Sequence, residues 1–256
     1  MRLQDKVMCV TGASSGIGKA IAERFAKEGA CVAFNWRAGG KLDAKGASQL
    51  AKTMGDKVIP VEGDTSKRAD AERMVRETVE KFGRIDIAIA NAGIEFHEPF
   101  LDVTDDHWNK VVAVNMYGAF VFTQAAARQM VKQGSGGKII FTSSVHEEIP
   151  LAGLAPYCAT KGGLRMLMRN MAIELAQYKI NVNNIAPGAI ATPINQEVLD
   201  DPKQLKEADS QIPWGRFGTP DEVASVAVFL GSDESSYVTG STYFVDGGMT
   251  REVTKF

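Results

Sequence analysis

The residues of this chain best suited to chemistry lie in the run Tyr157-Cys158-Ala159-Thr160-Lys161, with Ser144 thirteen residues upstream. If the run is helical, the phenol and the ammonium lie on one face. A phenol ionises near pH ~10, but a lysine beside it favours the phenolate and makes proton transfer possible at neutral pH. The same spacing occurs by chance in many helices, so its meaning depends on the elements that position it.

The amino-terminal sequence predicts a strand, a glycine-rich turn and a helix. Residues 6–11 are mostly apolar, Thr11 to Gly18 read Thr-Gly-Ala-Ser-Ser-Gly-Ile-Gly, and apolar residues continue at helical spacing from Ile17 to Phe25. Glycines let the backbone approach a ligand, and the first N–H groups of a helix attract an anion. The segment therefore predicts a phosphate-binding loop, although an ordinary tight turn would require the same flexible residues.

The rest of the chain alternates apolar strands with amphipathic helices. Strands are expected at residues 6–11, 31–35, 58–62, 85–90, 138–142, 181–186 and 242–245, and helices at 16–28, about 41–54, 69–82, 105–132 and 156–178. This alternation predicts one doubly wound α/β domain over residues 1–256, with a seven-stranded parallel sheet covered on both faces. The proline-containing, charged segment at about 190–217 interrupts the pattern. We expect it to be a substrate lid, with a decorative surface insertion as the alternative.

Several polar motifs directly follow predicted strands. They are Thr11–Gly18 after the first strand, Asp64 after the third, Asn91–Gly93 after the fourth, Ser144 after the fifth, and Pro187-Gly188 after the sixth. In open parallel sheets, ligands bind beyond the carboxyl ends of the strands. The motifs are therefore expected to meet in one site, since chance matches would scatter over both ends.

These motifs, in this order, resemble those of the short-chain dehydrogenase/reductase family over residues 6–249. Thr11–Gly18 matches the cofactor loop of that family, Asn91–Gly93 the motif after its fourth strand, and Asp246-Gly247-Gly248 its carboxyl-terminal signature. Four residues match its catalytic tetrad: Asn115, Ser144, Tyr157 and Lys161. The resemblance implies a Rossmann-type fold and an NAD(P)-dependent oxidoreductase.

The resemblance also implies roles for single residues. Tyr157 would exchange the hydroxyl proton, Lys161 would lower the Tyr157 pKa and hold the nicotinamide ribose, and Ser144 would hydrogen-bond the reacting oxygen. Asn115 would anchor a water that links Lys161 to solvent. Asp64 would bind the adenine amino group or, alternatively, cap the following helix, and Thr192 would hold the nicotinamide carboxamide. The residues expected to bind the dinucleotide are Thr11, Gly12, Ser14, Ser15, Gly16, Ile17, Gly18, Arg37, Asp64, Thr65, Asn91, Ala92, Gly93, Tyr157, Lys161, Pro187, Gly188, Ile190 and Thr192.

The end of the second predicted strand bears on the choice of dinucleotide. An acid there would bind the adenosine ribose and repel a 2′-phosphate. The run Phe34-Asn35-Trp36-Arg37 holds no carboxylate, and Arg37 could pair with the phosphate in bidentate fashion. The sequence therefore predicts that NADP is preferred and NAD accepted, although Ser15 stands where many NADP-preferring relatives carry a second basic residue. In the alternative, Arg37 points to solvent.

Composition is typical of a soluble enzyme. The chain has 256 residues, 45% of them hydrophobic, and its net charge of −2 gives no electrostatic case for a nucleic-acid or membrane partner. Three cysteines without paired spacing (Cys9, Cys31 and Cys158) favour a reducing compartment, so we expect a cytoplasmic location. No apolar run approaches the ~20 residues of a membrane span, no signal peptide is expected, and the three histidines form no metal-ligand pattern.

Four segments resemble bacterial glucose 1-dehydrogenases within the same family: residues 91–95, 143–150, 189–195 and 244–250. In those enzymes the positions of Glu95 and His146 lie beside the sugar, which implies oxidation of a sugar C1 hydroxyl, D-glucose to gluconolactone. Either residue could instead be a loop residue with only a local role. Ala90, Phe96 and His97 depart from the pattern and leave the breadth of sugar specificity open.

Two other functions share this fold. One is a 3-oxoacyl reductase acting on an acyl carrier protein, although the acidic loops 95–106 and 197–209 would repel an acidic carrier. The other is a dinucleotide-sensing module without turnover, against which the intact tetrad argues. The helix that carries Tyr157 is apolar on more than one face, and relatives pair through it and through the last strand, so we expect a homotetramer; a thick internal core is the alternative.

Overall fold

A single parallel sheet forms the centre of the computed structural model, which describes residues 1–251. Its strands run in the order β3-β2-β1-β4-β5-β6-β7 and are all parallel. Their bounds are β1 Val7–Val10, β2 Cys31–Trp36, β3 Val58–Glu62, β4 Ile87–Ala90, β5 Gly137–Thr142, β6 Ile180–Pro187 and β7 Thr242–Val245. The α/β fold with a seven-stranded parallel sheet, predicted from the alternation of apolar and amphipathic segments, is confirmed.

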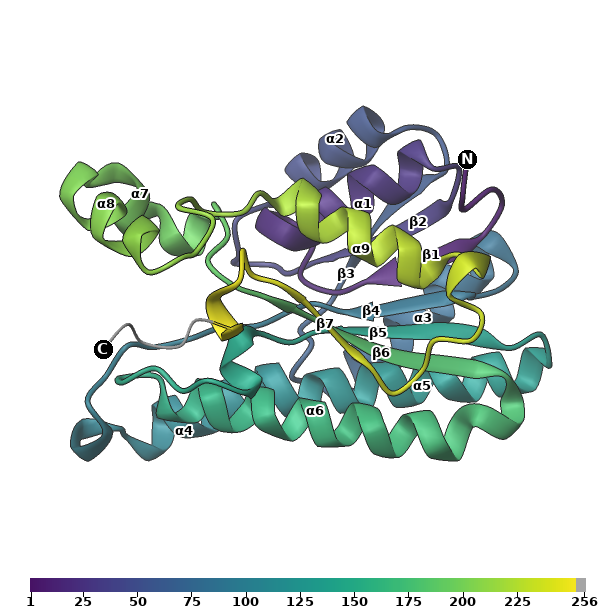
Figure 1. Ribbon diagram of the computed structural model, residues 1–256. Helices are drawn as coiled ribbons and strands as arrows, with labels where there is room; N and C mark the ends of the chain where they lie inside the picture. Colours follow the sequence, from purple (N-terminus) through teal and green to yellow (C-terminus); the bar gives the residue numbers. More distant parts are fainter. Residues whose placement is uncertain (252–256) are drawn as a thin grey trace.

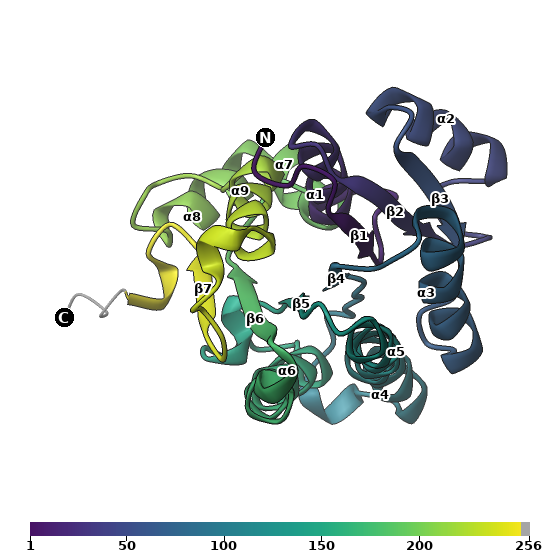
Figure 2. The ribbon, with the colours of Figure 1, turned by 90° about the vertical axis from the view of Figure 1, so that its right-hand side faces the viewer.

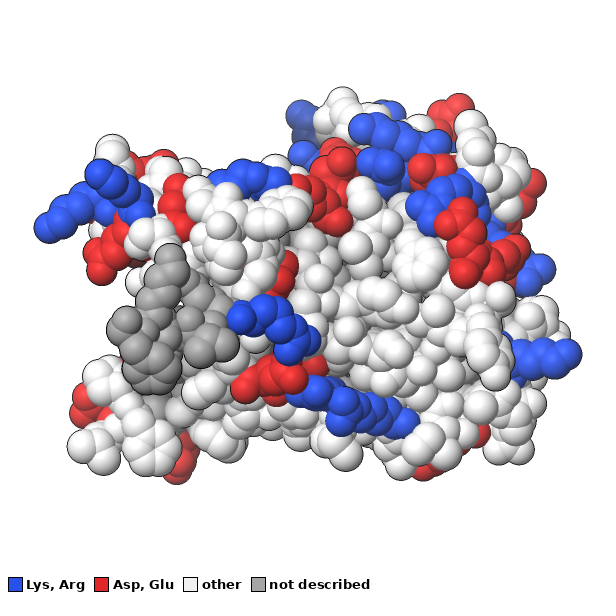
Figure 3. Space-filling view, in the orientation of Figure 1, with Lys and Arg blue, Asp and Glu red and all other residues white. Residues whose placement is uncertain are grey.

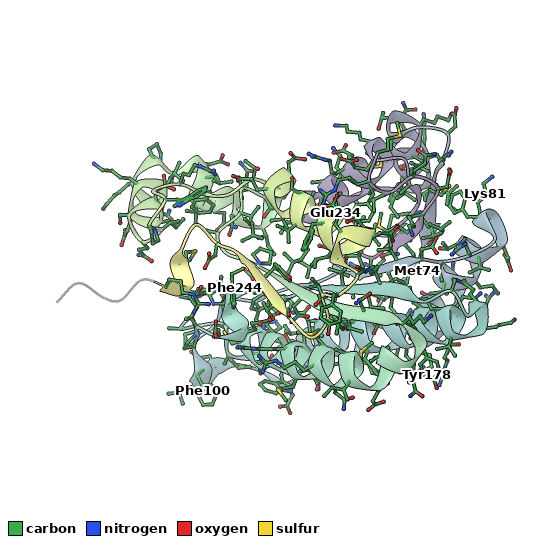
Figure 4. All side chains as sticks on the ribbon, turned by 45° about the vertical axis from the view of Figure 1, so that its right-hand side comes forward. Met74, Lys81, Phe100, Tyr178, Glu234 and Phe244 are labelled. Carbon is green, nitrogen blue, oxygen red and sulfur yellow. The ribbon has the colours of Figure 1, made fainter. Side chains whose placement is uncertain are left out.

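Helices cover both faces of the sheet, as Figure 2 shows. Because successive side chains of a strand point to opposite faces, Met8 and Val10 pack with one helical layer and Cys9 with the other. The first layer contains α1 Gly16–Lys27, α2 Ala44–Met54 and α9 Pro220–Gly231, and the second contains α3 Arg68–Phe82, α5 Ala119–Gln133 and α6 Ala155–Leu175. In Figure 4, Met74 of α3 lies on the core side, whereas Phe100 lies at the tip of an outer loop.

The helix expected at 105–132 differs from the prediction. It consists of α4 Asp105–Val111, a π-helical segment η2 Val112–Gly118, and α5. A π turn widens the helix by one residue, and such turns are frequent at functional sites. The periodicity of apolar residues reveals the helix but not this local change in hydrogen bonding. The remaining boundaries agree with the predictions to within three residues.

The segment 190–217 carries two short helices, α7 Gln196–Asp200 and α8 Pro202–Ser210, which project from the body in Figure 1. Neither helix has a buried residue. At the neck of the segment, the Ala191 amide donates to the Gly218 carbonyl at 2.8 Å, and the Gly218 amide donates to the Ala189 carbonyl at 2.9 Å. The segment is therefore fastened at its base and exposed at its tip.

Across residues 1–251, none of the helices combines the length and the apolar character that crossing a bilayer requires.

Candidate active site

A cleft of about 1380 Å³ lies at the carboxyl ends of the strands. It is lined by the turns after β1 to β6 and by the base of the 190–217 segment, so the motifs that were expected to meet do so. All of the predicted dinucleotide-binding residues line it except Thr11, which lies just behind it. In Figure 1 the carboxyl ends of the strands, whose following turns line the cleft, lie on the side of α4, α7 and α8, away from the N-terminus.

The glycine-rich turn is shaped to bring backbone close to a ligand. Gly12 and Gly16 have φ values of +63° and +56°, a region that side chains other than glycine rarely adopt. At Gly18 a Cβ atom would overlap the Asn91 side chain and the Gly12 carbonyl. Helix α1 begins at Gly16, and the side chain of its N-cap, Ser15, makes no capping hydrogen bond. The first turn of α1 therefore offers N–H groups to an anion, which fits the pyrophosphate of a dinucleotide.

Thr11 and Asn91 hold this turn in place. The Thr11 hydroxyl accepts hydrogen bonds from the backbone N–H groups of Asn91 (3.0 Å) and Ala92 (3.1 Å). The Asn91 side-chain nitrogen donates in turn to the carbonyls of Thr11 and Gly12. These bonds join the end of β1 to the end of β4, so the two residues act on a ligand mainly by fixing the loop.

Asn35, which was not predicted as a site residue, ties the same loop to β2 and β3. It is buried at the end of β2, and its side-chain oxygen accepts from the Gly12 N–H at 3.1 Å. Its side-chain nitrogen donates to the carbonyls of Trp36 and Gly63, each at 2.9 Å. The only signal in the sequence is a polar residue in an otherwise apolar strand, and its bonding partners are set by the tertiary structure.

Two basic side chains line the end of the cleft beside β2 and β3. One is Arg37 and the other is Lys41, which the sequence analysis missed; both are exposed. Asp64 does not cap α3, because the N-cap is Lys67; its carboxylate instead accepts from the N–H and the hydroxyl of Ser66. Thr65 is buried beside it and also lines the cleft.

Tyr157, Ser144 and Lys161 meet in the middle of the cleft. Burial raises the pKa of the Tyr157 phenol, and the Ser144 hydroxyl opposes this shift. The Lys161 nitrogen lies 5.2 Å from the centre of the Tyr157 ring and donates to the Thr142 carbonyl at 2.8 Å. Burial also lowers the pKa of Lys161 to about 8, while Glu95 and Glu147 act to raise it. The sequence predicts that Lys161 lowers the Tyr157 pKa; here burial has the largest effect and raises that pKa.

Asn115 lies in the π-helical segment and fixes the loop after β4. Its side-chain oxygen accepts from the Ile94 N–H at 2.8 Å, and its side-chain nitrogen donates to the Ile94 carbonyl at 2.9 Å. A Cβ atom placed on Gly93 would lie 3.6 Å from the Asn115 oxygen and 3.9 Å from the Lys161 nitrogen. Gly93 therefore lies close to both side chains.

Glu95 and His146 lie on the wall beside Tyr157. Burial raises the pKa of the Glu95 carboxyl, and His146, Lys161 and His97 oppose the shift. The His146 ring packs edge-on against the Tyr157 ring, with centroids 6.1 Å apart, and its Nδ1 lies 2.9 Å from the Ile149 carbonyl oxygen. A carbonyl only accepts, so Nδ1 carries the proton of that bond and leaves Nε2 of the neutral ring as an acceptor.

On the opposite wall, Pro187, Gly188, Ile190 and Thr192 lead into the 190–217 segment. The Thr192 side chain lies 3.6 Å from the position that a Cβ atom on Gly16 would occupy. The base of the segment thus lies beside the glycine-rich turn. No group of three or more His, Cys, Asp and Glu side chains in residues 1–251 is arranged to hold a metal ion.

Known proteins resemble the chain over nearly its full length. A family model described as Enoyl-(Acyl carrier protein) reductase matches residues 12–250. A glucose 1-dehydrogenase of Gluconobacter oxydans is 41% identical, over 97% of this chain and 93% of that protein. An L-rhamnose-1-dehydrogenase of Scheffersomyces stipitis is also 41% identical, over 96% of each chain.

Solved structures share the fold as well as the sequence pattern. A gluconate 5-dehydrogenase from Burkholderia cenocepacia, solved in complex with NADP and tartrate, superposes with a TM-score of 0.92 at 36% identity and 98% coverage of both chains. The matches, together with the glycine-rich turn and the sheet order, show that the chain belongs to the short-chain dehydrogenase/reductase family of NAD(P)-dependent oxidoreductases.

Proposed function

We propose that this enzyme oxidises the C1 hydroxyl of an aldose, D-glucose to gluconolactone in the first instance. The observation that carries the proposal is the position of Glu95 and His146 on the wall beside Tyr157. A sugar presents several neighbouring hydroxyl groups, and here a carboxylate and an imidazole acceptor lie within reach of the proton-transfer group. Relatives that act on glucose and rhamnose support a sugar as the substrate class.

The tetrad roles follow from this placement and are part of the proposal. Tyr157 takes the hydroxyl proton in oxidation and returns it in reduction, and Ser144 donates a hydrogen bond to the reacting oxygen. Lys161, buried beside the ring, holds the nicotinamide ribose hydroxyls and supplies positive charge. Asn115 holds the Ile94 backbone beside Gly93, close to Lys161, and anchors a water that links Lys161 to solvent. When bound, the dinucleotide supplies the hydride acceptor.

The charge near the reacting groups favours a neutral sugar over a sugar acid. Glu95 is a half-buried carboxyl, and a carboxylate substrate beside it would add a second negative charge in a partly dry site. The other residues of this wall include Ile94, Ile149 and Leu154, which can pack against the C–H groups of a sugar ring. Gluconate, the substrate named for one solved relative, is therefore expected to be poorer than glucose.

The direct test is reduced-nicotinamide absorbance after mixing the protein with a substrate and either dinucleotide. D-glucose should give a steady rise with NADP and a slower one with NAD, whereas D-gluconate should give little. Oxidation of NADPH by an acetoacetyl thioester, without reaction on sugars, would favour the carrier-protein reductase instead. Dinucleotide binding without turnover on any of these would favour a sensing module.

We propose that NADP is preferred because Arg37 and Lys41 both lie where an acid would otherwise bind the ribose. Replacing Arg37 with alanine should remove a charge-assisted contact of about 1.5–3 kcal/mol. The KM for NADP should rise about 10- to 150-fold, and the KM for NAD should change little. Lys45→Ala, an exposed residue in α2 outside the cleft, is the control. Equal losses with both dinucleotides would show that Arg37 does not bind the phosphate.

A further inference from the structure

Glu147 is a buried carboxylate that lies outside the cleft, on the turn η3 Val145–Glu147 that follows Ser144. Its side chain is 0% exposed. Burying a carboxylate is costly unless hydrogen bonds and charges compensate for the lost hydration. A turn with no further role could carry a solvent-exposed side chain here and avoid this desolvation cost. The partners of Glu147 therefore indicate the role of its buried charge.

Glu147 joins three elements to this turn. One carboxylate oxygen accepts from the Asn184 side-chain nitrogen of β6 at 2.9 Å. The other accepts from the Thr242 hydroxyl of β7 at 2.8 Å. The Arg165 Nε atom of α6 lies 3.5 Å from that second oxygen. Asn184 is itself 0% exposed, so this is a polar network inside the protein rather than a surface ion pair.

The network is one short turn away from the reacting groups. The Ser144 hydroxyl accepts from the His146 N–H at 3.2 Å, and the Ser144 carbonyl accepts from the Glu147 N–H at 3.0 Å. Glu147 is therefore linked directly to the Ser144 backbone, and the adjacent residue His146 is linked to the Ser144 side chain. The charge of Glu147 also acts on Lys161, where it and Glu95 oppose the effect of burial.

We propose that Glu147 is a positioning residue, which fixes the turn carrying Ser144 against β6, β7 and α6 and places its carboxylate near Lys161. This inference rests on the proposed roles of Ser144 and Lys161. Among residues 1–251, Arg165 lies beside the Glu147 carboxylate and Lys161 is influenced by its charge; both are on α6, and the partners of Glu147 on β6 and β7 are neutral. Lys161 in turn faces Glu95, Glu147 and Tyr157.

The test is Glu147→Gln, which keeps the size of the side chain and removes its charge. Without that charge, Lys161 should lose its proton at lower pH than in the wild-type enzyme, where its pKa is about 8. The pH dependence of Lys161 modification by an amine-specific reagent, followed by mass spectrometry, should therefore shift to lower pH. This readout needs no turnover, so it separates failure of the inference from failure of the proposed sugar oxidation.

Turnover provides the second readout. On whichever substrate the wild-type enzyme uses, Glu147→Gln should lower kcat by about 10- to 100-fold, about 1.4–2.7 kcal/mol, and leave the KM for the dinucleotide near its wild-type value. Glu147→Asp, which retains the charge, should restore part of the rate. If Glu147→Gln fails to fold, Thr242→Val removes one anchor of the carboxylate at nearly constant volume and should lower kcat in the same direction.

Glu148→Gln is the matched control. Glu148 is adjacent, also faces Arg165 at 3.4 Å, and has a side chain that is 35% exposed. It should leave kcat and the titration of Lys161 unchanged. The inference would be overturned if Lys161 titrates in folded Glu147→Gln as it does in the wild-type enzyme. Loss of dinucleotide binding in parallel with kcat would also overturn it, because that would indicate general disruption of the fold.

Discussion

The Tyr157 phenol loses its proton at a higher pH than a solvent-exposed tyrosine does. Burial raises the phenol pKa, so at neutral pH the side chain is an acid ready to protonate a carbonyl, and it must lose that proton before it can accept one from an alcohol. The oxidation rate should therefore rise between about pH 6 and about pH 10, while the rate of reduction should not. Rates measured in both directions over this range would check the sign, and a flat profile for oxidation would contradict it.

Removal of the phenol hydroxyl should show that Tyr157 acts on the proton and not on binding. Tyr157→Phe should lower kcat by about 10²- to 10⁴-fold, the usual contribution of a positioned acid or base. Dinucleotide binding, followed by quenching of protein fluorescence, should stay close to wild type. Tyr178→Phe is the control, because Tyr178 is an exposed tyrosine at the far end of the same helical stretch (Figure 4). Near wild-type turnover of Tyr157→Phe would exclude Tyr157 as the acid–base group.

Among the elements, the 190–217 segment is held at its base and exposed at its tip, and on this ground we propose that it is a lid. Its base is held by the paired backbone of residues 189–191 with Gly218 and by the Trp214 N–H, which donates to the Gly247 carbonyl at 3.2 Å. Its helices α7 and α8 contain no buried residue, so few contacts oppose movement of the tip. We propose that the segment closes over bound dinucleotide and substrate, because Thr192 and Ile190 at its base line the cleft.

Limited proteolysis would test this closure. Trypsin should cut after Lys203 and Lys206 in α8, both exposed, and cutting should slow several-fold when NADP and substrate are added. Exposed Lys132, near the carboxyl end of α5 and distant from the cleft in sequence and in fold, provides the internal control. Equal protection at all three lysines would indicate general stabilisation by ligand, and no protection at α8 would contradict a closing lid.

The surface of the whole molecule favours self-association. In Figure 3 the centre of one face, over β7 and the adjoining part of α9, has few charged side chains. β7 is an edge strand of the sheet, and such edges are normally shielded. On α6, Met166 and Ile173 are 62% and 78% exposed although both are apolar. We propose that copies of the chain cover these surfaces in a homotetramer with two-fold axes.

Size-exclusion chromatography with light scattering should then report about four times the chain mass of 27.6 kDa. Ile173→Lys places a charge in the proposed contact and should shift the protein to smaller species. Gln49→Lys adds the same charge at an exposed position of α2, at the opposite end of the sheet, and should leave the oligomeric state unchanged. A wild-type monomer would exclude the tetramer.

The order of elements, the seven-stranded sheet and the place of the cleft were predictable from the sequence by itself, because they depend on local patterns. Apolar runs and helical spacing mark the elements, and glycines at Gly12 and Gly16 mark backbone that other residues rarely adopt. Contacts between distant residues decided the rest. The bonds of Asn115 to Ile94, the loop bonds of Asn35 and the buried network of Glu147 each join segments that no local pattern connects. The pKa of Tyr157 was also decided by the tertiary structure. Its largest influence is burial, which depends on how the whole molecule packs and outweighs the effect of residues near Tyr157 in the sequence.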